Sequence, residues 1–153
     1  MKLDFRAGVV GVFVNSKKQL LVGERSDVAG AWQLPQGGID PGESSIAAIY
    51  REMTEEVGSG DFKIITIATR LVTYRFPEVL ASKVEAGAAR KYAGQTQQWY
   101  LLEFNAGGGP NLAKADKEFR GFDWWDAIRV VNAVIDFKRD AYKDGLRQLG
   151  FAV

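Results

Sequence analysis

The chain has 153 residues, of which 46% are hydrophobic and 25% are charged, a balance typical of one globular domain with a core of its own. Its formal net charge of +1 excludes a strong overall attraction to nucleic acid, so any binding of a polyanion must come from local clusters of charge. The sequence contains no cysteine and no histidine, which excludes disulfides, thiolate nucleophiles, imidazole bases and the usual zinc sites.

The first predicted element is a strand over residues 7–14, because its nearly continuous β-branched run is typical of a strand buried on both faces. A polar turn at residues 15–18 and an apolar run at residues 19–23 predict a partner strand that closes a hairpin. A short apolar segment over residues 31–34 then leads into the Pro-Gln-Gly-Gly turn of residues 35–38. Glycines in that turn would allow the backbone to approach a metal or a phosphate closely.

A helix is predicted to follow, with Ser44 or Ser45 as its N-cap and Gly58 as its C-cap. Its apolar residues recur at offsets of three and four and would form one stripe that faces a core. The stripe comprises Ile46, Ile49, Tyr50, Met53 and Val57.

Three glutamates of the same segment, Glu52, Glu55 and Glu56, point in a mean direction roughly 130° from the apolar stripe. The C-terminal end of a helix is unfavourable for anions, and neighbouring carboxylates repel one another. A solvated charged face is the plain interpretation of such a cluster. A hard divalent cation such as Mg²⁺ or Mn²⁺ is the alternative, because oxygen ligands suit it and it would offset the repulsion.

The second half of the chain predicts further strands. Residues 62–72 alternate well enough for a strand or a strand pair, residues 73–78 should break it at Pro77, and residues 97–104 and 121–125 are further strand candidates. Residues 81–94 are locally basic and predict a mobile loop near the site, or a plain surface loop.

A helical turn over residues 125–134 and a last helix over residues 134–149 complete the prediction. The mixed charges of the last helix favour a solvated face over a nucleic-acid stripe. Strands interrupted by one helix and followed by another predict an α/β fold, an α/β/α sandwich with a mixed central sheet, in a single domain over residues 1–153. No stretch approaches the length of a membrane span, so we expect a cytoplasmic protein, by default a monomer.

The segment from Gly37 onward resembles the signature of the Nudix hydrolases. Gly37, five residues, Glu43, seven residues and the run REMTEEVG of residues 51–58 match every charged and glycine position of that signature. The signature ends in an aliphatic residue where this chain has Ser59, a departure that removes no metal ligand. The resemblance implies a Nudix-type α/β/α sandwich that hydrolyses phosphoanhydride bonds.

Further segments resemble the bacterial RNA pyrophosphohydrolases and the plant-type dinucleoside polyphosphate hydrolases. These are the AWQLPQGGI run of residues 31–39, the GQTQQWY run of residues 94–100, and the EFRGFDW and DFKRD runs of residues 118–124 and 136–140. The resemblance covers nearly the entire chain.

That resemblance assigns residues one by one. It implies that Mg²⁺ ions are held by Glu52, Glu55, Glu56, Glu118 and a glycine carbonyl at Gly37 or Gly38, with Mn²⁺ as a substitute. It also implies substrate contacts of three kinds: a nucleobase between Arg25 and Phe137, Lys138 beside that base, and Arg6 and Tyr74 near the phosphates.

Clustered carboxylates around Mg²⁺ suit attack of water on a phosphoanhydride, and without histidine the general base must be a carboxylate. Arg51 can hold one carboxylate in place by a bidentate pair, and Glu43 can organise the preceding loop. The leading hypothesis is removal of pyrophosphate from the 5′ end of triphosphorylated RNA, with dinucleoside polyphosphates or nucleoside triphosphates as alternative substrates. A module that senses nucleotides without cleaving them is a third alternative, which the intact carboxylate set disfavours.

Overall fold

The computed structural model describes residues 4–77 and 92–153 of the chain. The predicted loop over residues 81–94 therefore lies largely outside the described residues, including Lys83, Arg90 and Lys91. In chain order the described elements are β1 Phe5–Phe13, β2 Leu20–Arg25, β3 Trp32–Gln33, β4 Gln36–Gly38, α1 Ser45–Val57, β5 Phe62–Ile67, β6 Val72–Arg75, β7 Gly94–Phe104, β8 Phe119–Trp125, α4 Ala127–Ala133, the 3₁₀ helix η1 Asp136–Lys138 and α5 Arg139–Gln148.

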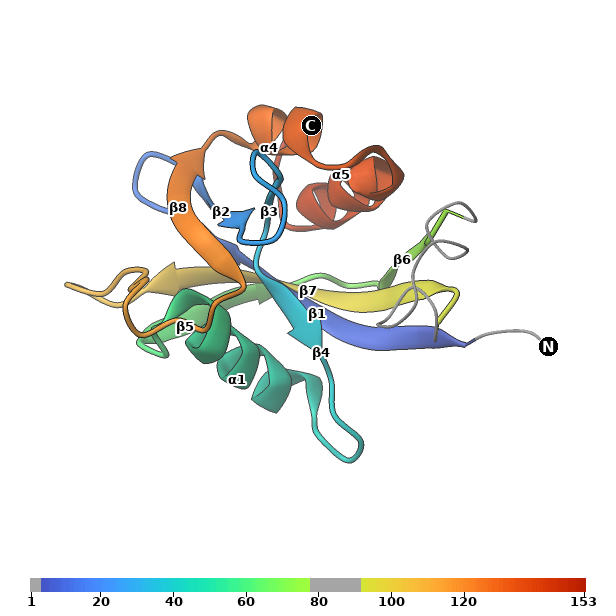
Figure 1. The fold of residues 1–153 in the computed structure, drawn as a ribbon, viewed down its shortest axis with the longest axis horizontal. Coiled ribbons are helices and arrows are strands. Elements are labelled where there is room, and N and C mark those ends of the chain that lie inside the picture. Colours follow the sequence, from blue (N-terminus) through green and yellow to red (C-terminus); the bar gives the residue numbers. More distant parts are fainter. Residues whose placement is uncertain (1–3, 78–91) are drawn as a thin grey trace.

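Two sheets form the centre of the described structure. In the larger sheet, of order β4-β1-β7-β5, β1 is parallel to β7 and antiparallel to β4, and β6 also pairs with β7. The smaller sheet is antiparallel, with the order β3-β2-β8. Figure 1 shows α1 on one side of the strands and α4 and α5 on the other. The predicted α/β/α arrangement with a mixed sheet is confirmed.

Strand β1 is buried on both faces, as its sequence predicts. Val9 and Phe13 pack into the core cluster that includes α1, whereas Val10 and Val12 pack into the cluster that includes α4 and α5. Alternate side chains of a strand point to opposite faces, so this one strand contributes to both cores and holds the helices on the two sides in place relative to its neighbouring strands.

The predicted hairpin of β1 and β2 is wrong. A single bridge between Val14 and Leu20 joins the two segments, and β2 then pairs with β3 and β8. The physical reason is that β7 occupies one edge of β1 along its whole length and β4 takes the other edge at residues 8–10, while both edges of β2 are used by β3 and β8. The turn at residues 15–18 therefore carries the chain from one sheet to the next.

Helix α1 begins and ends where its capping residues predict. The Ser44 hydroxyl accepts a hydrogen bond from the Ala47 amide at 3.1 Å, and Gly58 follows the last helical residue in the left-handed conformation. The predicted apolar stripe is only partly correct, because Ile46 and Tyr50 are exposed. Tyr50 stacks on Phe62 of β5 and covers it from the solvent side, so this ring shields the core without being enclosed by it.

Two predictions for the later segments are also corrected. Residues 73–75, expected to break a strand, belong to β6, which ends before Pro77. The last helix is shorter than predicted, since Val134 ends α4 in an extended conformation and η1 precedes α5. Tyr142 attaches α5 to the sheets, because its buried hydroxyl accepts a hydrogen bond from the Leu34 amide at 3.0 Å.

Candidate active site

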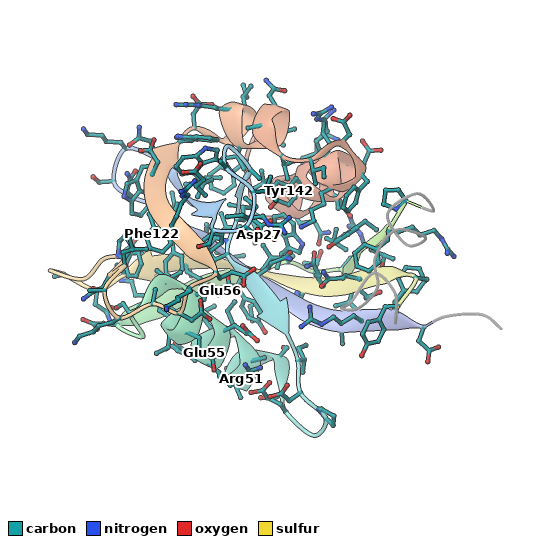
Figure 2. The ribbon with its side chains drawn as sticks, in the orientation of Figure 1. Asp27, Arg51, Glu55, Glu56, Phe122 and Tyr142 are labelled. Carbon is teal, nitrogen blue, oxygen red and sulfur yellow. The ribbon has the colours of Figure 1, made fainter. Side chains whose placement is uncertain are left out.

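The neighbouring glutamates of α1 lie in very different surroundings. Glu56 is only 6% exposed, and its carboxylate accepts a hydrogen bond from the Gln36 amide at 2.9 Å. The Glu55 side chain is 50% exposed. Figure 2 shows Glu56 nearer the centre of the molecule than Glu55 and Arg51, which come from the same helix. The helical rotation thus separates two members of the predicted cluster, leaving Glu56 buried and Glu55 solvated.

Glu52 lies against the glycine turn of β4. A Cβ atom at Gly37 would overlap the Glu52 carboxyl group, so only glycine leaves room for this close approach. Burial raises the pKa of Glu52, and the nearby Arg51 and Arg6 guanidinium groups act in the opposite direction. The predicted metal-binding residues Gly37 and Glu52 are therefore adjacent in the structure.

Arg51 holds the turn and the helix together. Its guanidinium donates to both carboxylate oxygens of Glu43 at 2.8 Å, to the Gly38 carbonyl oxygen at 2.8 Å and to Glu52 at 2.8 Å. Hydrogen bonds from Arg51 hold the pKa of Glu43 down at about 2. One bidentate pair with Glu43 and a single bond to Glu52 give Arg51 a fixed geometry. The sequence predicted a bidentate pair for Arg51 without naming its carboxylate, and a role for Glu43 in the preceding loop.

An acidic group surrounds Glu56. Burial raises the pKa of Glu56 well above its ordinary value, and the like charges of Glu118, Glu52 and Asp116 act in the same direction. Glu118, which comes from a distant part of the sequence, is thus brought within electrostatic reach of Glu56. Within the described residues the group combines one helix and one loop.

The loop that carries Glu118 is attached to the C-terminal end of α1. The Asp116 amide donates to the Glu55 carbonyl oxygen at 2.7 Å, and the Asp116 carboxylate accepts from the Glu118 amide at 3.0 Å. The Glu118 carbonyl oxygen in turn accepts from the Ser26 amide at 2.9 Å. Sequence reasoning missed Asp116, although a second acidic residue two positions before Glu118 was a signal that could have found it.

The donor chemistry of this acidic group suits a hard divalent cation. Carboxylate oxygens and a glycine carbonyl oxygen are the ligands that Mg²⁺ prefers, and a cation between Glu56, Glu52 and Glu118 would offset their repulsion. In the described ranges no three acidic side chains converge closely enough to form a ready-made ion site. Arg51 holds one oxygen of Glu52, and Glu55 faces solvent. Binding of an ion would therefore require side-chain adjustment within α1.

A second set of predicted residues lies across three neighbouring strands. Arg6 of β1 is paired with Gln95 of β7, and Gln95 is paired with Tyr74 of β6. The Arg6 guanidinium lies against Gly38, and the Tyr74 hydroxyl accepts a hydrogen bond from the Gln95 side chain at 2.8 Å. The structure therefore brings Arg6 and Tyr74 together beside the glycine turn.

Lys138 is buried beside the same acidic group. It is 7% exposed, and burial lowers its pKa to about 8. The positive charge of Arg25 acts in the same direction, and the negative charges of Glu56 and Glu118 oppose it. Lys138 thus lies within electrostatic reach of Arg25, Glu56 and Glu118. Its contact with substrate stays a prediction, as does that of Arg25.

The predicted sandwich of a base between Arg25 and Phe137 is not preformed. The Phe137 ring packs against Tyr74 and Phe76, with ring centroids 5.9 Å and 6.4 Å away. Arg25 is held by two hydrogen bonds from its guanidinium to Asp27 and lines a pocket of about 240 Å³. Apolar residues complete much of its wall, among them Val28, Trp32, Ala133 and Ile135. Phe137 is not part of that wall.

Three glutamine side chains next to the site, two of them buried, were also missed from the sequence. Gln36, Gln95 and Gln97 are joined by hydrogen bonds through their side chains. The two glutamines of β7 are separated by one residue and so share a face of the strand, a signal that polar alternation could have supplied.

In the described residues we find no helix long and apolar enough to cross a membrane.

Comparison with known sequences identifies the family. The model of the NUDIX domain matches residues 4–144. An RNA pyrophosphohydrolase of Rhodospirillum rubrum is 36% identical over 153 aligned residues, which cover 99% of this chain and 91% of that protein. Nudix hydrolase 25 of Arabidopsis thaliana is 34% identical over 151 residues, covering 95% of this chain and 86% of that protein.

Solved structures agree on the fold. The dihydroneopterin triphosphate pyrophosphohydrolase of E. coli superimposes with a TM-score of 0.67 and 20% identity, covering 94% of this chain and 99% of that one. An Ap4A hydrolase of C. elegans superimposes with a TM-score of 0.63 and 18% identity, covering 97% and 100%. The domain match and the sequence relatives together show that the chain belongs to the Nudix family, as a pyrophosphohydrolase of that family.

Proposed function

We propose that this chain is a Mg²⁺-dependent RNA pyrophosphohydrolase, which removes pyrophosphate from the 5′-triphosphate end of RNA and leaves a 5′-monophosphate. The observation that carries the proposal is the buried carboxylate of Glu56, surrounded by the like charges of Glu52 and Glu118 beside the Gly37 turn. Such a group has a strong electrostatic reason to bind a divalent cation. The full-length similarity to an enzyme called RNA pyrophosphohydrolase supports RNA as the substrate.

The metal-binding residues in this proposal are Glu52, Glu56, Glu118 and the Gly37 carbonyl, with Glu55 joining them by rotation of its exposed side chain. When bound, Mg²⁺ would neutralise phosphate oxygens and lower the pKa of a coordinated water, and Mn²⁺ would be able to replace it. Arg51 keeps Glu52 against the turn, and a carboxylate of the group accepts the proton of the attacking water.

Basic side chains on the other side of the site would bind the polyphosphate substrate. Arg6, beside Gly38, would contact phosphate oxygens, and Arg25 would offer a flat guanidinium to a base, with the buried Lys138 beside that base. The RNA monophosphate product would be open to further decay. The cytoplasmic location and the monomeric state stay predictions.

Hydrolysis of dinucleoside polyphosphates is the alternative, because the same metal site would serve both reactions. The two substrates differ in the part that extends out of the pocket beyond the first nucleotide. The described residues near Arg25 would contact that part. Nucleoside triphosphates are a further alternative. A module that only senses nucleotides is disfavoured, since binding alone gives no reason to bury the Glu56 carboxylate among like charges.

The test compares product formation from 5′-triphosphorylated RNA, diadenosine tetraphosphate and free nucleoside triphosphates in Mg²⁺. We expect the highest kcat/KM for RNA, with pyrophosphate released and a 5′-monophosphate left. Faster turnover of the dinucleotide by a wide margin would overturn the RNA assignment while keeping the reaction class. The Glu56→Gln variant, purified in the same way, controls for contaminating phosphatases.

A further inference from the structure

Two buried glutamines of β7 lie between the candidate metal site and the candidate phosphate site. Gln95 is 4% exposed and Gln97 is 1% exposed, and they share one face of the strand. Their amides cross over Gly8 of β1, where a Cβ atom would lie 3.2 Å from the Gln95 side-chain oxygen and 2.8 Å from the Gly37 carbonyl oxygen. The missing side chain at Gly8 therefore makes room for this amide row.

The row has a defined hydrogen-bond direction. The Gln97 amide nitrogen donates to the side-chain oxygen of Gln36 at 2.9 Å and to that of Gln95 at 3.4 Å. A side-chain amide has two protons, so both are used. Because the Gln95 oxygen faces Gln97, the Gln95 amino group must face the other way, where it donates to the Tyr74 hydroxyl at 2.8 Å.

This direction decides what Tyr74 can offer a ligand. A phenol has one proton, and an oxygen that accepts from Gln95 must direct that proton elsewhere. None of the hydrogen bonds among the described residues uses the proton of the Tyr74 hydroxyl as a donor. Burial raises the pKa of Tyr74 to about 12, so the proton stays on the hydroxyl oxygen at neutral pH. Arg6 lies within electrostatic reach of the same hydroxyl.

We propose that Gln97 is a positioning residue that acts through Gln95 and fixes the Tyr74 hydroxyl as a hydrogen-bond donor to a phosphate oxygen of the substrate. The inference rests on the proposed function, because it takes the space beside Arg6 as the place of the polyphosphate. A neutral donor held this way is ready before the ligand arrives, so little reorganisation is needed when charge develops on the phosphate.

The test is a double-mutant cycle with Gln97→Met and Tyr74→Phe, measured as kcat/KM on whichever of the three polyphosphate substrates is turned over fastest. Methionine keeps the length of the side chain and removes both donors. The Gln95 amide is then free to flip, so that its oxygen can face the Tyr74 hydroxyl. We expect Tyr74→Phe to lower kcat/KM by about 10-fold to 100-fold, the size of a hydrogen bond to a charged group. Gln97→Met should lower it about 5-fold to 30-fold alone, and by no more than about twofold when Tyr74→Phe is already present.

Equal losses from Gln97→Met in both backgrounds would overturn the proposal, since they would show a merely structural role. An unchanged kcat/KM for Tyr74→Phe would overturn it too, while leaving the proposed function intact if Glu56→Gln is inactive. Should Gln97→Met not fold, Gln95→Met takes its place in the cycle. The same dependence on Tyr74 is expected, and equal losses in both backgrounds would again overturn the proposal. Gln98→Met is the matched control, because its amide donates to the Ala68 carbonyl oxygen at 2.8 Å, outside the row. It should change kcat/KM by less than about twofold.

Discussion

The α1 edge of the candidate site and the strand edge formed by β1, β6 and β7 hold their polar groups by different means. On the α1 edge, Arg51 binds Glu43 and Glu52 through charged hydrogen bonds, and Glu56 lies buried among like charges. On the strand edge, neutral amides of Gln95 and Gln97 connect to the Tyr74 hydroxyl. The ionisation of the first edge must respond to pH and to a metal, whereas the second keeps one protonation state. The α1 edge is therefore completed only when a metal binds, whereas the polar groups of the strand edge are already in place.

The largest effect should come from Glu56→Gln, which leaves the shape of the α1 edge and removes its buried charge. We expect turnover to fall on the order of 10³–10⁵-fold, because a carboxylate central to the metal site is lost. Glu103→Gln is the control, since Glu103 makes an exposed ion pair with Lys63 on β5. Steady-state rates with RNA in Mg²⁺ measure both, and near-normal turnover of folded Glu56→Gln would contradict the metal assignment.

The same substitution should change the pH dependence of stability without metal. The folded pKa of Glu56 is raised above 4.5, so the folded state keeps a proton that the unfolded state loses. The free energy of unfolding of the natural protein should therefore fall as pH rises above about 4.5 toward the folded pKa. Glu56→Gln should lack this part of the fall and be more stable near neutral pH by about 1–3 kcal/mol. Urea unfolding at pH 5 and pH 7.5 tests this, and a parallel pH response in both proteins would contradict it.

A smaller effect is expected from Gly37→Ala, which tests the close approach of Glu52 to the turn. The new methyl group would push the Glu52 carboxylate away and should lower kcat about 100-fold, the effect of a misplacement near 1 Å. Gly121→Ala is the matched control, because a Cβ atom there would meet nothing within 4 Å. If both variants keep full activity, Glu52 does not need its place against the turn.

Arg51→Lys should cost less, about 10-fold to 100-fold in kcat/KM, because lysine keeps the charge but cannot make the paired bonds to Glu43. Raising the ionic strength should not restore the lost rate, since the loss is one of geometry. A lysine variant with unchanged kcat/KM would show that charge alone is needed at this position.

The smallest effect should come from Asp27→Asn. This change removes the charge that holds Arg25 beside its pocket, and we expect KM to rise about threefold to tenfold with little change in kcat. Stability should change by less than about 0.5 kcal/mol, because the pair is largely exposed. A fall in kcat at unchanged KM would show instead that Asp27 acts on the α1 edge.

Local patterns predicted the α1 edge well, and they predicted the strand edge poorly. The caps of α1, the pair of Arg51 and Glu43 and the approach to Gly37 all arise within about twenty residues, where helical geometry fixes relative positions. The α/β/α arrangement followed from the order of elements.

Local patterns could not predict the pairing of strands that are distant in the sequence. β1 pairs in parallel with β7, some ninety residues away along the chain, and this register sets Arg6 beside Gln95 and Tyr74. The hairpin of β1 and β2 was wrong for the same reason, since a strand cannot show in its own sequence which partners occupy its edges. The positions of Lys138 and Phe137 depended on where α4 ends, which Val134 alone does not indicate.

The metal site proposed around Glu56 is tested most directly by diffraction from crystals soaked in Mn²⁺, with the ion located by its anomalous signal in the natural protein and in Glu56→Gln. We expect an ion at about 2.0–2.3 Å from oxygens of Glu52 and Glu56, with Glu118 or the Gly37 carbonyl completing its ligands, and loss of that ion in the variant. An ion bound on the exposed side of α1 at Glu55 alone, or an ion retained unchanged in Glu56→Gln, would contradict the proposed site.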